Sequence, residues 1–204
     1  MIEEHLLGRD IRDPAVIRAM REVPREEFVP EELADYAYED YPLPIGEDQT
    51  ISQPYIVAYM TEALELSATD RVLEIGTGSG YAAAVLGRIA ATVHTVERIP
   101  SLARTARQRL EMLGYGNIHV HEGDGTLGWP DNAPYNAIVV TAGAPQVPEQ
   151  LMVQLAVHGR LVIPVGPTLT VQTLVRVRRI SEDDYRHEAL CGVRFVPLVG
   201  IDGW

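Results

Sequence analysis

The chain has 204 residues, and all 17 of its basic side chains are arginine because the sequence contains no lysine. This absence excludes three classes of enzyme that depend on a lysine, namely Schiff-base enzymes, P-loop NTPases and protein kinases. The 29 acidic residues bring the net charge to -12. A protein this acidic is not expected to bind nucleic acid, because that affinity comes mainly from cationic side chains.

The remaining composition is that of a globular protein, with 46% apolar and 23% charged residues. No apolar run approaches the ~20 residues that a membrane span needs. The acidic N-terminus lacks the basic and then apolar layout of a signal peptide, and the single cysteine, Cys191, cannot form an internal disulfide. We therefore expect a cytoplasmic protein that has no membrane partner.

Residues 1–60 are predicted to form a helical region that ends in an extended loop. Asp13 can cap a helix that ends before Pro24, and a second helix is expected to start near Pro54. The proline-rich stretch 41–46 between them indicates an extended loop. Three tyrosines precede this loop, and we interpret them as packing residues, with the lining of a peptide groove as the alternative: Tyr36, Tyr38 and Tyr41.

From residue 71 to 166, short apolar strands alternate with helices. Strands are expected over 71–75, 93–96, 118–120, 137–140 and 160–165, and helices over 81–90, 101–113 and 147–155. This alternation predicts an α/β fold, a doubly wound and mostly parallel sheet of Rossmann-like type with helices on both faces. Residues 170–179 and 189–198 predict an added antiparallel hairpin. We interpret residues 1–204 as one domain, with 170–204 as its C-terminal hairpin region.

A glycine run follows the first strand of this core. In residues 76–80 the spacing is G-x-G-x-G, and a strand, a glycine loop and a helix in this order let a nucleoside ligand approach the backbone closely. Glu97 is expected at the end of the second strand, where an acid accepts hydrogen bonds from both ribose hydroxyls. The alternative is that the glycines only form a tight turn.

The spacing distinguishes between two cofactors. A dinucleotide fingerprint places a third glycine where this chain has Tyr81. S-adenosylmethionine has no pyrophosphate to hold, and Glu74, just ahead of the run, can meet its cationic amino-acid portion. Asp124, between two glycines after the third strand, can hydrogen-bond an exocyclic amine of adenine, although a Gly-Asp-Gly sequence alone often forms only a turn. The core 71–166 is thus predicted to bind S-adenosylmethionine.

Five segments carry a resemblance to one family. They are residues 44–54 (PIGEDQTISQP), 73–81 (LEIGTGSGY), 139–145 (VVTAGAP), 159–166 (GRLVIPVG) and 193–198 (VRFVPL). On these segments the chain resembles the protein-L-isoaspartate O-methyltransferases over nearly its whole length. The first segment is specific to that family, because generic methyltransferases do not carry it.

The resemblance implies methyl transfer from S-adenosylmethionine to the free α-carboxylate of L-isoaspartyl residues in damaged proteins and peptides. The ester then closes to a succinimide, whose hydrolysis returns some normal aspartate. Ser52 matches the family's active-site serine. The positions matched near or at the cofactor are Thr50, Ile51, Glu74, Gly76, Gly78, Glu97, Asp124 and Gly125. Val199 stands where some relatives have a polar cofactor contact. A monomer is what the resemblance implies.

The chemistry needs no strong base, because an α-carboxyl group with a pKa of about 3.5 is already ionised at neutral pH. The enzyme has to align the carboxylate oxygen, the methyl carbon and the sulfonium sulfur, and the Ser52 hydroxyl can hold the carboxylate. The alternative role of Ser52 is to cap the helix that starts near Pro54.

The sequence is also compatible with two other functions. A methyltransferase with another acceptor and a non-catalytic cofactor-binding protein both stay open, whereas Tyr81 disfavours a Rossmann oxidoreductase. His119 and His121 share one face of a strand, but no third ligand stands nearby at metal spacing, so we expect no metal site. Cys191 is expected to pack as a small apolar side chain.

Overall fold

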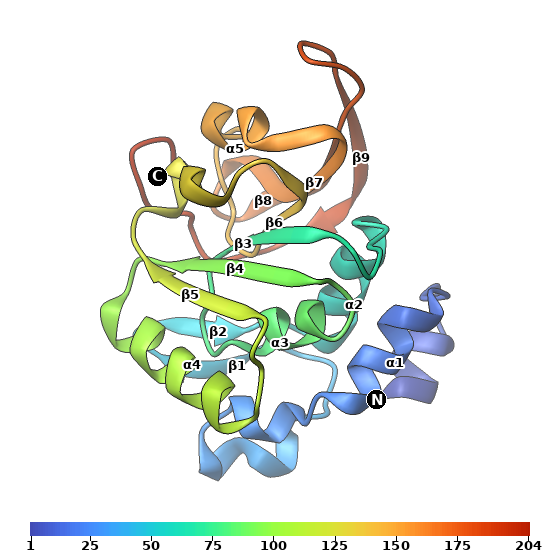
Figure 1. Ribbon diagram of the computed structural model, residues 1–204. Helices are drawn as coiled ribbons and strands as arrows, with labels where there is room; N and C mark the ends of the chain where they lie inside the picture. The colour runs from blue at the N-terminus through green and yellow to red at the C-terminus, as the bar shows by residue number, and fades with distance from the viewer.

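A sheet of seven strands forms the centre of the computed structural model, which describes residues 1–204 (Figure 1). The strands are β3 (Arg71–Ile75), β4 (Thr92–Glu97), β5 (Ile118–Glu122), β6 (Tyr135–Val140), β7 (Leu155–Thr168), β8 (Val171–Arg179) and β9 (Tyr185–Val193). They lie in the order β5-β4-β3-β6-β7-β8-β9, and the first five run parallel. β8 and β9 are antiparallel. The predicted mostly parallel sheet with a C-terminal hairpin is confirmed.

The helices cover both faces of this sheet. They are α1 (Pro14–Glu22), α2 (Pro54–Ala63), α3 (Tyr81–Gly87), α4 (Pro100–Met112) and α5 (Glu149–Val153). A short π-helix, η1 (Ile2–Leu7), and four 3₁₀-helices, η2 (Arg25–Phe28), η3 (Glu31–Tyr36), η4 (Gly125–Leu127) and η5 (Pro130–Asn132), complete the helical elements. Figure 1 shows α1 to α4 on one face and α5 on the other. No helix is long and apolar enough to cross a membrane.

Two apolar clusters follow from the alternation of side chains along each strand. Val72 of β3 and Val139 of β6 belong to a cluster of 32 buried residues under α1, α2 and α3. Leu73 and Ile138, their neighbours in sequence, belong to a cluster of 14 on the α5 face. Strands buried on both faces read as continuous apolar runs, which is why the core strands were recognisable in the sequence.

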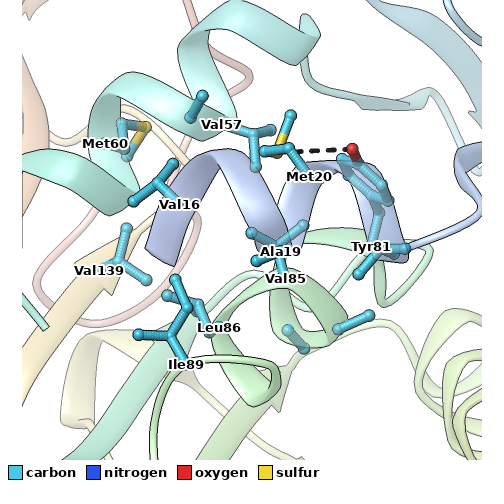
Figure 2. Packing of buried hydrophobic residues seen from close by; sticks show 14 of the residues in the cluster. Val16, Ala19, Met20, Val57, Met60, Tyr81, Val85, Leu86, Ile89 and Val139 are labelled. Carbon is cyan, nitrogen blue, oxygen red and sulfur yellow. Dashed lines mark hydrogen bonds between the residues drawn. The ribbon is translucent and has the colours of Figure 1, made fainter. Parts of the chain in front are cut away.

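Helix α1 lies between α2 and α3 (Figure 2). Its buried side chains, Val16 and Met20 among them, face residues of both neighbours, and the Tyr81 hydroxyl donates a hydrogen bond to Met20 Sδ over 3.6 Å. Asp13 Oδ1 accepts hydrogen bonds from the amides of Ala15 and Val16 at 2.7 and 3.3 Å. The predicted cap of this helix is confirmed.

The loop expected over 41–46 is instead the first strand of a small hairpin. β1 (Leu43–Gly46) pairs with β2 (Gln49–Ile51), and the turn between them consists of Glu47 and Asp48. Both turn residues have positive φ, 52° and 56°, as a two-residue hairpin turn of the primed type requires. Because the usual Asn-Gly or Asp-Gly pair is missing here, the sequence did not indicate a turn.

Three other expectations need correction. Helix 147–155 is shorter, since α5 ends at Val153 and β7 already begins at Leu155. The last strand ends at Val193, and residues 194–198 leave the sheet. The prediction that Tyr36, Tyr38 and Tyr41 pack into the core is wrong, because these three residues are 41–52% exposed. The Tyr38 hydroxyl donates to Glu26, which lets this amphipathic side chain lie at the surface.

The direction of winding reverses between β3 and β6. From β3 the chain proceeds to β4 and β5 on one side, and from β6 it proceeds to β7 on the other. In open α/β sheets a ligand binds outside the carboxyl ends of the strands at such a reversal. A ligand site is therefore expected at the residues that follow β3 and β6.

Three histidines gather on one face of β4 and β5. The rings of His119 and His121 stack on His94, with centroids 5.0 and 5.3 Å away, and His94 Nδ1 lies 3.0 Å from His121 Nε2. No group of three or more His, Cys, Asp or Glu side chains is arranged to hold a metal ion. Burial, followed by the charges of the other two histidines and of Arg71, lowers the pKa of His94 from 6.5 to about 4.

This shift predicts an acid-sensitive fold. The unfolded chain binds a proton at His94 near pH 6.5 and the folded chain only near pH 4, so the folded state loses stability as the pH falls from 7 to 4. The loss is at most about 3 kcal/mol. We expect His94→Asn, which keeps a polar group near the place of Nδ1, to flatten the pH dependence of the free energy of unfolding measured in urea. The exposed His187→Asn, on β9 at the opposite edge of the sheet, is the control, and equal flattening in both variants contradicts the assignment.

Candidate functional site

The glycine run forms the turn between β3 and α3. Gly76, Gly78 and Gly80 all have positive φ, at 96°, 53° and 92°. A Cβ atom on Gly76 would lie 2.4 Å from Thr141 Oγ1, which donates to the carbonyl oxygens of Ile75 and Gly76 at 3.0 and 2.8 Å. Glycine is therefore required at Gly76, because the ends of β3 and β6 approach each other there.

Glu97 lies beside this loop at the end of β4, as predicted. Its Oε2 accepts a hydrogen bond from the Gly78 amide and its Oε1 accepts one from the Ile99 amide, both over 2.9 Å. The side chain is 6% exposed. Each carboxylate oxygen has a second acceptor position, so Glu97 can still accept hydrogen bonds from a ligand.

These residues line a cavity that we call the glycine-loop hollow. Five of the predicted positions lie along it, namely Thr50, Gly76, Gly78, Glu97 and Gly125. A Cβ atom on Gly125 would lie 2.3 Å from Ile75 Cγ2, so a side chain at this position would force the end of β3 to move. Val199 also lines this hollow. Its apolar side chain provides no polar contact there.

Glu74 does not line the glycine-loop hollow. Its side chain is fully buried beneath the loop, where Oε2 accepts a hydrogen bond of 2.6 Å from Thr95 and Oε1 has no partner. Thr95 Oγ1 lies 2.7 Å from Thr77 Oγ1 in the glycine run. Burial raises the pKa of Glu74 to about 8, the Thr95 hydroxyl lowers it and the charge of Glu97 raises it. The carboxyl group is mainly protonated at neutral pH and supports the loop from below.

Asp124 also lies outside the lining of this hollow, next to Gly125. Its Oδ1 accepts from the amide and the hydroxyl of Thr126 at 2.9 and 2.7 Å, and its Oδ2 accepts from the Ile201 amide at 2.9 Å. Burial alone would raise the pKa of Asp124, but the hydrogen bonds from Ile201 and Thr126 lower it overall. Asp124 thus joins η4 to the C-terminal segment.

A second and larger cavity, of about 950 Å³, lies beside the first, and we call it the Ser52 hollow. Ser52 and Thr50 line it from the start of α2 and from β2, and Gln172 and Arg194 line it from the C-terminal hairpin region. The two hollows share four lining residues, which are Thr50, Thr141, Val196 and Pro197. A ligand in each hollow would meet the other at this shared wall.

Ser52 does not cap helix α2. The residue at the N-cap position is Gln53. Neither its side chain nor that of Ser52 accepts a hydrogen bond from the first amides of the helix. Asp40 performs this function, since its Oδ1 accepts from the Tyr55 amide at 3.2 Å and its Oδ2 accepts from Gln53 Nε2 at 2.8 Å. The Ser52 hydroxyl makes no hydrogen bond within the chain, so it is free to bind a ligand. Ile51, buried behind it, lines a small side cavity with Ser52.

Two residues that line the Ser52 hollow, Thr141 and Gln172, were not singled out from the sequence. Thr141 follows β6 at the reversal of winding, and this position was the available signal. Gln172 is 4% exposed and pairs with the backbone of Phe195, accepting from its amide at 2.8 Å and donating to its carbonyl at 3.2 Å. It fixes the segment after β9 against β8. No local sequence pattern predicts this hydrogen bond, because Gln172 and Phe195 are 23 residues apart in the chain.

Comparison with known proteins agrees with this geometry. The family model "Protein-L-isoaspartate(D-aspartate) O-methyltransferase (PCMT)" matches residues 1–203. Protein-L-isoaspartate O-methyltransferase 2 of Pelobacter propionicus and protein-L-isoaspartate O-methyltransferase 1 of Geotalea uraniireducens are each 72% identical to the chain over 204 residues. These matches cover all of this chain and 91% and 93% of the two relatives.

Solved structures show the same fold. A protein-L-isoaspartate O-methyltransferase superimposes with a TM-score of 0.89 at 32% identity, covering 100% of this chain and 67% of that chain. A Plasmodium falciparum protein in complex with S-adenosyl-L-homocysteine superimposes with a TM-score of 0.82 at 24% identity, covering 97% and 96%. At that identity the second match shows the fold alone. From the family model and the full-length relatives, the chain belongs to the protein-L-isoaspartate(D-aspartate) O-methyltransferase family.

Proposed function

We propose that this chain transfers a methyl group from S-adenosylmethionine to the free α-carboxylate of L-isoaspartyl residues in proteins and peptides. The observation that carries this proposal is the pair of hollows that share the wall of Thr50 and Thr141. A group-transfer enzyme needs its two reactants side by side, and each hollow provides a place for one of them.

The glycine-loop hollow fits the cofactor. Three glycines line this hollow, Gly76, Gly78 and Gly125, and because they have no side chains a nucleoside can approach their backbone closely. Glu97, already fixed by the amides of Gly78 and Ile99, has acceptor positions left for two ribose hydroxyls. When bound, S-adenosylmethionine supplies an electrophilic methyl group on a sulfonium sulfur.

The Ser52 hollow fits the acceptor. The Ser52 hydroxyl can donate a hydrogen bond to a carboxylate because it has no partner within the chain, and Arg194 adds a positive charge to the same lining. The α-carboxylate needs no general base, since it is already ionised at neutral pH. The residues of this hollow have to hold the carboxylate, orient it toward the shared wall and exclude water.

Glu74 and Asp124 are proposed to act at the cofactor from outside the lining of the hollow. Glu74 holds the glycine run in place through Thr95 and Thr77. Asp124 holds the segment that contributes Leu198 and Val199 to the wall of the hollow. Only Asp124, whose side chain is partly exposed, can also contact the cofactor in this arrangement, because Glu74 is fully buried.

The function is tested with labelled S-adenosylmethionine and two peptides that differ only in carrying L-isoaspartate or L-aspartate at one position. We expect a base-labile methyl ester on the isoaspartyl peptide alone. Transfer to both peptides alike would indicate another acceptor specificity. Transfer to neither, with cofactor binding retained, would indicate a non-catalytic cofactor-binding protein and would overturn the proposal.

Ser52→Ala tests the acceptor side. Removing one hydrogen bond to a charged group costs about 1.5–3 kcal/mol, so we expect kcat for the isoaspartyl peptide to fall about 10- to 100-fold. The affinity for S-adenosylhomocysteine, measured by calorimetry, is expected to stay within about 3-fold, because Ser52 does not line the glycine-loop hollow. Ser181→Ala, in the exposed turn of the C-terminal hairpin, is the matched control. A parallel loss of cofactor affinity would assign Ser52 a role in folding instead.

Glu97→Gln tests the cofactor side. A glutamine amide cannot accept at both ends, so the variant loses one backbone hydrogen bond and the ionised acceptor for the ribose. We expect the Kd for S-adenosylhomocysteine to rise about 10- to 100-fold. Glu122→Gln is the matched control, because Glu122 is the in-register neighbour of Glu97 on β5 but is exposed and outside the hollow. Equal weakening in both variants would mean that only the acidic charge of the region matters.

A further inference from the structure

Arg25 is the largest fully buried side chain of the molecule, and it lies next to the candidate active site. It begins η2 directly after Pro24, and its exposed fraction is 0%. Its Nε donates a hydrogen bond of 2.7 Å to the Ala37 carbonyl, and its Nη2 donates one of 2.8 Å to the Ser52 carbonyl. One guanidinium group thus connects the segment after η3 with the serine proposed to hold the acceptor.

The same guanidinium also contacts the cofactor-binding part of the chain. Its central carbon lies 4.7 Å from the ring centroid of Tyr81, in a cation–π arrangement. Tyr81 is the residue that follows the glycine run and opens α3, and it is 1% exposed. The ring of Phe28 packs edge-to-face with that of Tyr81, with the two centroids 5.6 Å apart. Arg25 therefore lies between the Ser52 segment and the start of α3.

Burying the charged Arg25 side chain costs free energy, because the charge loses its hydration. Nη1 has no hydrogen-bond partner, and no carboxylate lies within ion-pair distance of the guanidinium group. The nearby Asp40 forms its ion pair with Arg9 instead. Burial lowers the pKa of Arg25, although the nearby Tyr81 hydroxyl and the charge of Asp40 act in the opposite direction. Apolar residues that replace buried charges often stabilise a fold, so stability alone does not account for an arginine here.

We propose that Arg25 is a positioning residue for methyl transfer, which fixes Ser52 relative to the glycine run through its hydrogen bond to the Ser52 carbonyl. This inference rests on the role proposed above for Ser52. The Ser52 side chain has no hydrogen bond of its own within the chain, so the place of its hydroxyl depends on its backbone. Arg25 holds that backbone with a rigid planar fork, and a misplacement of about 1 Å can reduce a transfer rate 100-fold.

The first test compares Arg25→Met and Arg25→Lys with the wild type. Methionine keeps much of the apolar stem and removes every donor, whereas lysine keeps the charge and the donors on a single nitrogen, which cannot span both carbonyls. We expect Arg25→Met to lower kcat about 10- to 100-fold and Arg25→Lys to restore part of it. The KM for S-adenosylmethionine is expected to stay within about 3-fold, because Arg25 does not line the glycine-loop hollow. If Arg25→Met does not fold, Arg25→Lys alone decides, and unchanged kcat in that variant overturns the proposal.

The matched control is Arg160→Met. Arg160 is another mostly buried arginine that donates to two backbone carbonyls, those of Leu64 and Glu65, and its Nη2 lies 3.4 Å from Asp70. It lines neither hollow. We expect Arg160→Met to lower Tm at least as much as Arg25→Met while kcat stays within about 3-fold of wild type. Equal losses of kcat in both variants would show that Arg25 contributes only to folding.

A double-mutant cycle with Ser52→Ala distinguishes positioning from other effects on activity. If Arg25 acts through the Ser52 hydroxyl, adding Arg25→Lys to Ser52→Ala changes kcat by less than about 3-fold, because there is no hydroxyl left to place. If Arg25→Lys lowers kcat by the same factor with and without the hydroxyl, Arg25 does not act through Ser52. The proposal is then wrong.

An activity-independent measurement separates this inference from the proposed function. Hydrogen–deuterium exchange over residues 49–54 should be faster in Arg25→Lys than in wild type and unchanged in Arg160→Met. Faster exchange in an enzyme that methylates neither peptide would overturn the proposed function while retaining the mechanical role of Arg25. Unchanged exchange in an active enzyme would overturn the role of Arg25 and leave the function intact.

Discussion

The close approach of β3 and β6 at their carboxyl ends is the constraint on which the rest of the site depends. Thr141 bridges the two strands by donating to the carbonyls of Ile75 and Gly76, and this contact leaves no room for a side chain on Gly76. Because the chain winds away in opposite directions from these strands, a crevice is expected above their carboxyl ends, which is where ligands bind in open α/β sheets. Thr141 belongs to both hollows for this reason.

Buried polar groups lie beneath the residues that line this crevice and fix their positions. The protonated Glu74 and the threonines bonded to it lie under the glycine run, and Gln172 holds the segment after β9. Arg25 lies under Ser52. Each of these groups is hydrogen-bonded to backbone or to a neighbouring hydroxyl, and each would be unfavourable in an interior chosen for stability alone. They fix the positions of the residues around the crevice in the absence of a ligand, so that these residues need to move little when a ligand binds.

The sequence predicted those parts of the site that are encoded locally. The alternation of strands and helices predicted the sheet, and the three residues Gly76, Gly78 and Glu97, chosen from their spacing, line one hollow in the structure. Features that depend on contacts between distant segments were not predictable in this way. Asp40 replaces Ser52 as the cap of α2 from 15 residues away, and the Ile201 amide reaches Asp124 from 77 residues away. The β1–β2 hairpin was missed because two acidic residues occupy turn positions that usually take asparagine or glycine.

The hydrogen bonds of Asp124 have a consequence for the chemical durability of the protein itself. Asp124 is followed by Gly125, and an aspartyl-glycyl pair closes to a succinimide when the glycine amide nitrogen reaches the side-chain carboxyl carbon. Here three hydrogen bonds, from Thr126 and Ile201, hold the ionised carboxylate, and Gly125 is buried against Ile75. The side chain is thus not free to rotate toward the attacking nitrogen. The contacts that join η4 to the C-terminal segment also protect the enzyme's own aspartate from ageing into the kind of residue that the enzyme is proposed to methylate.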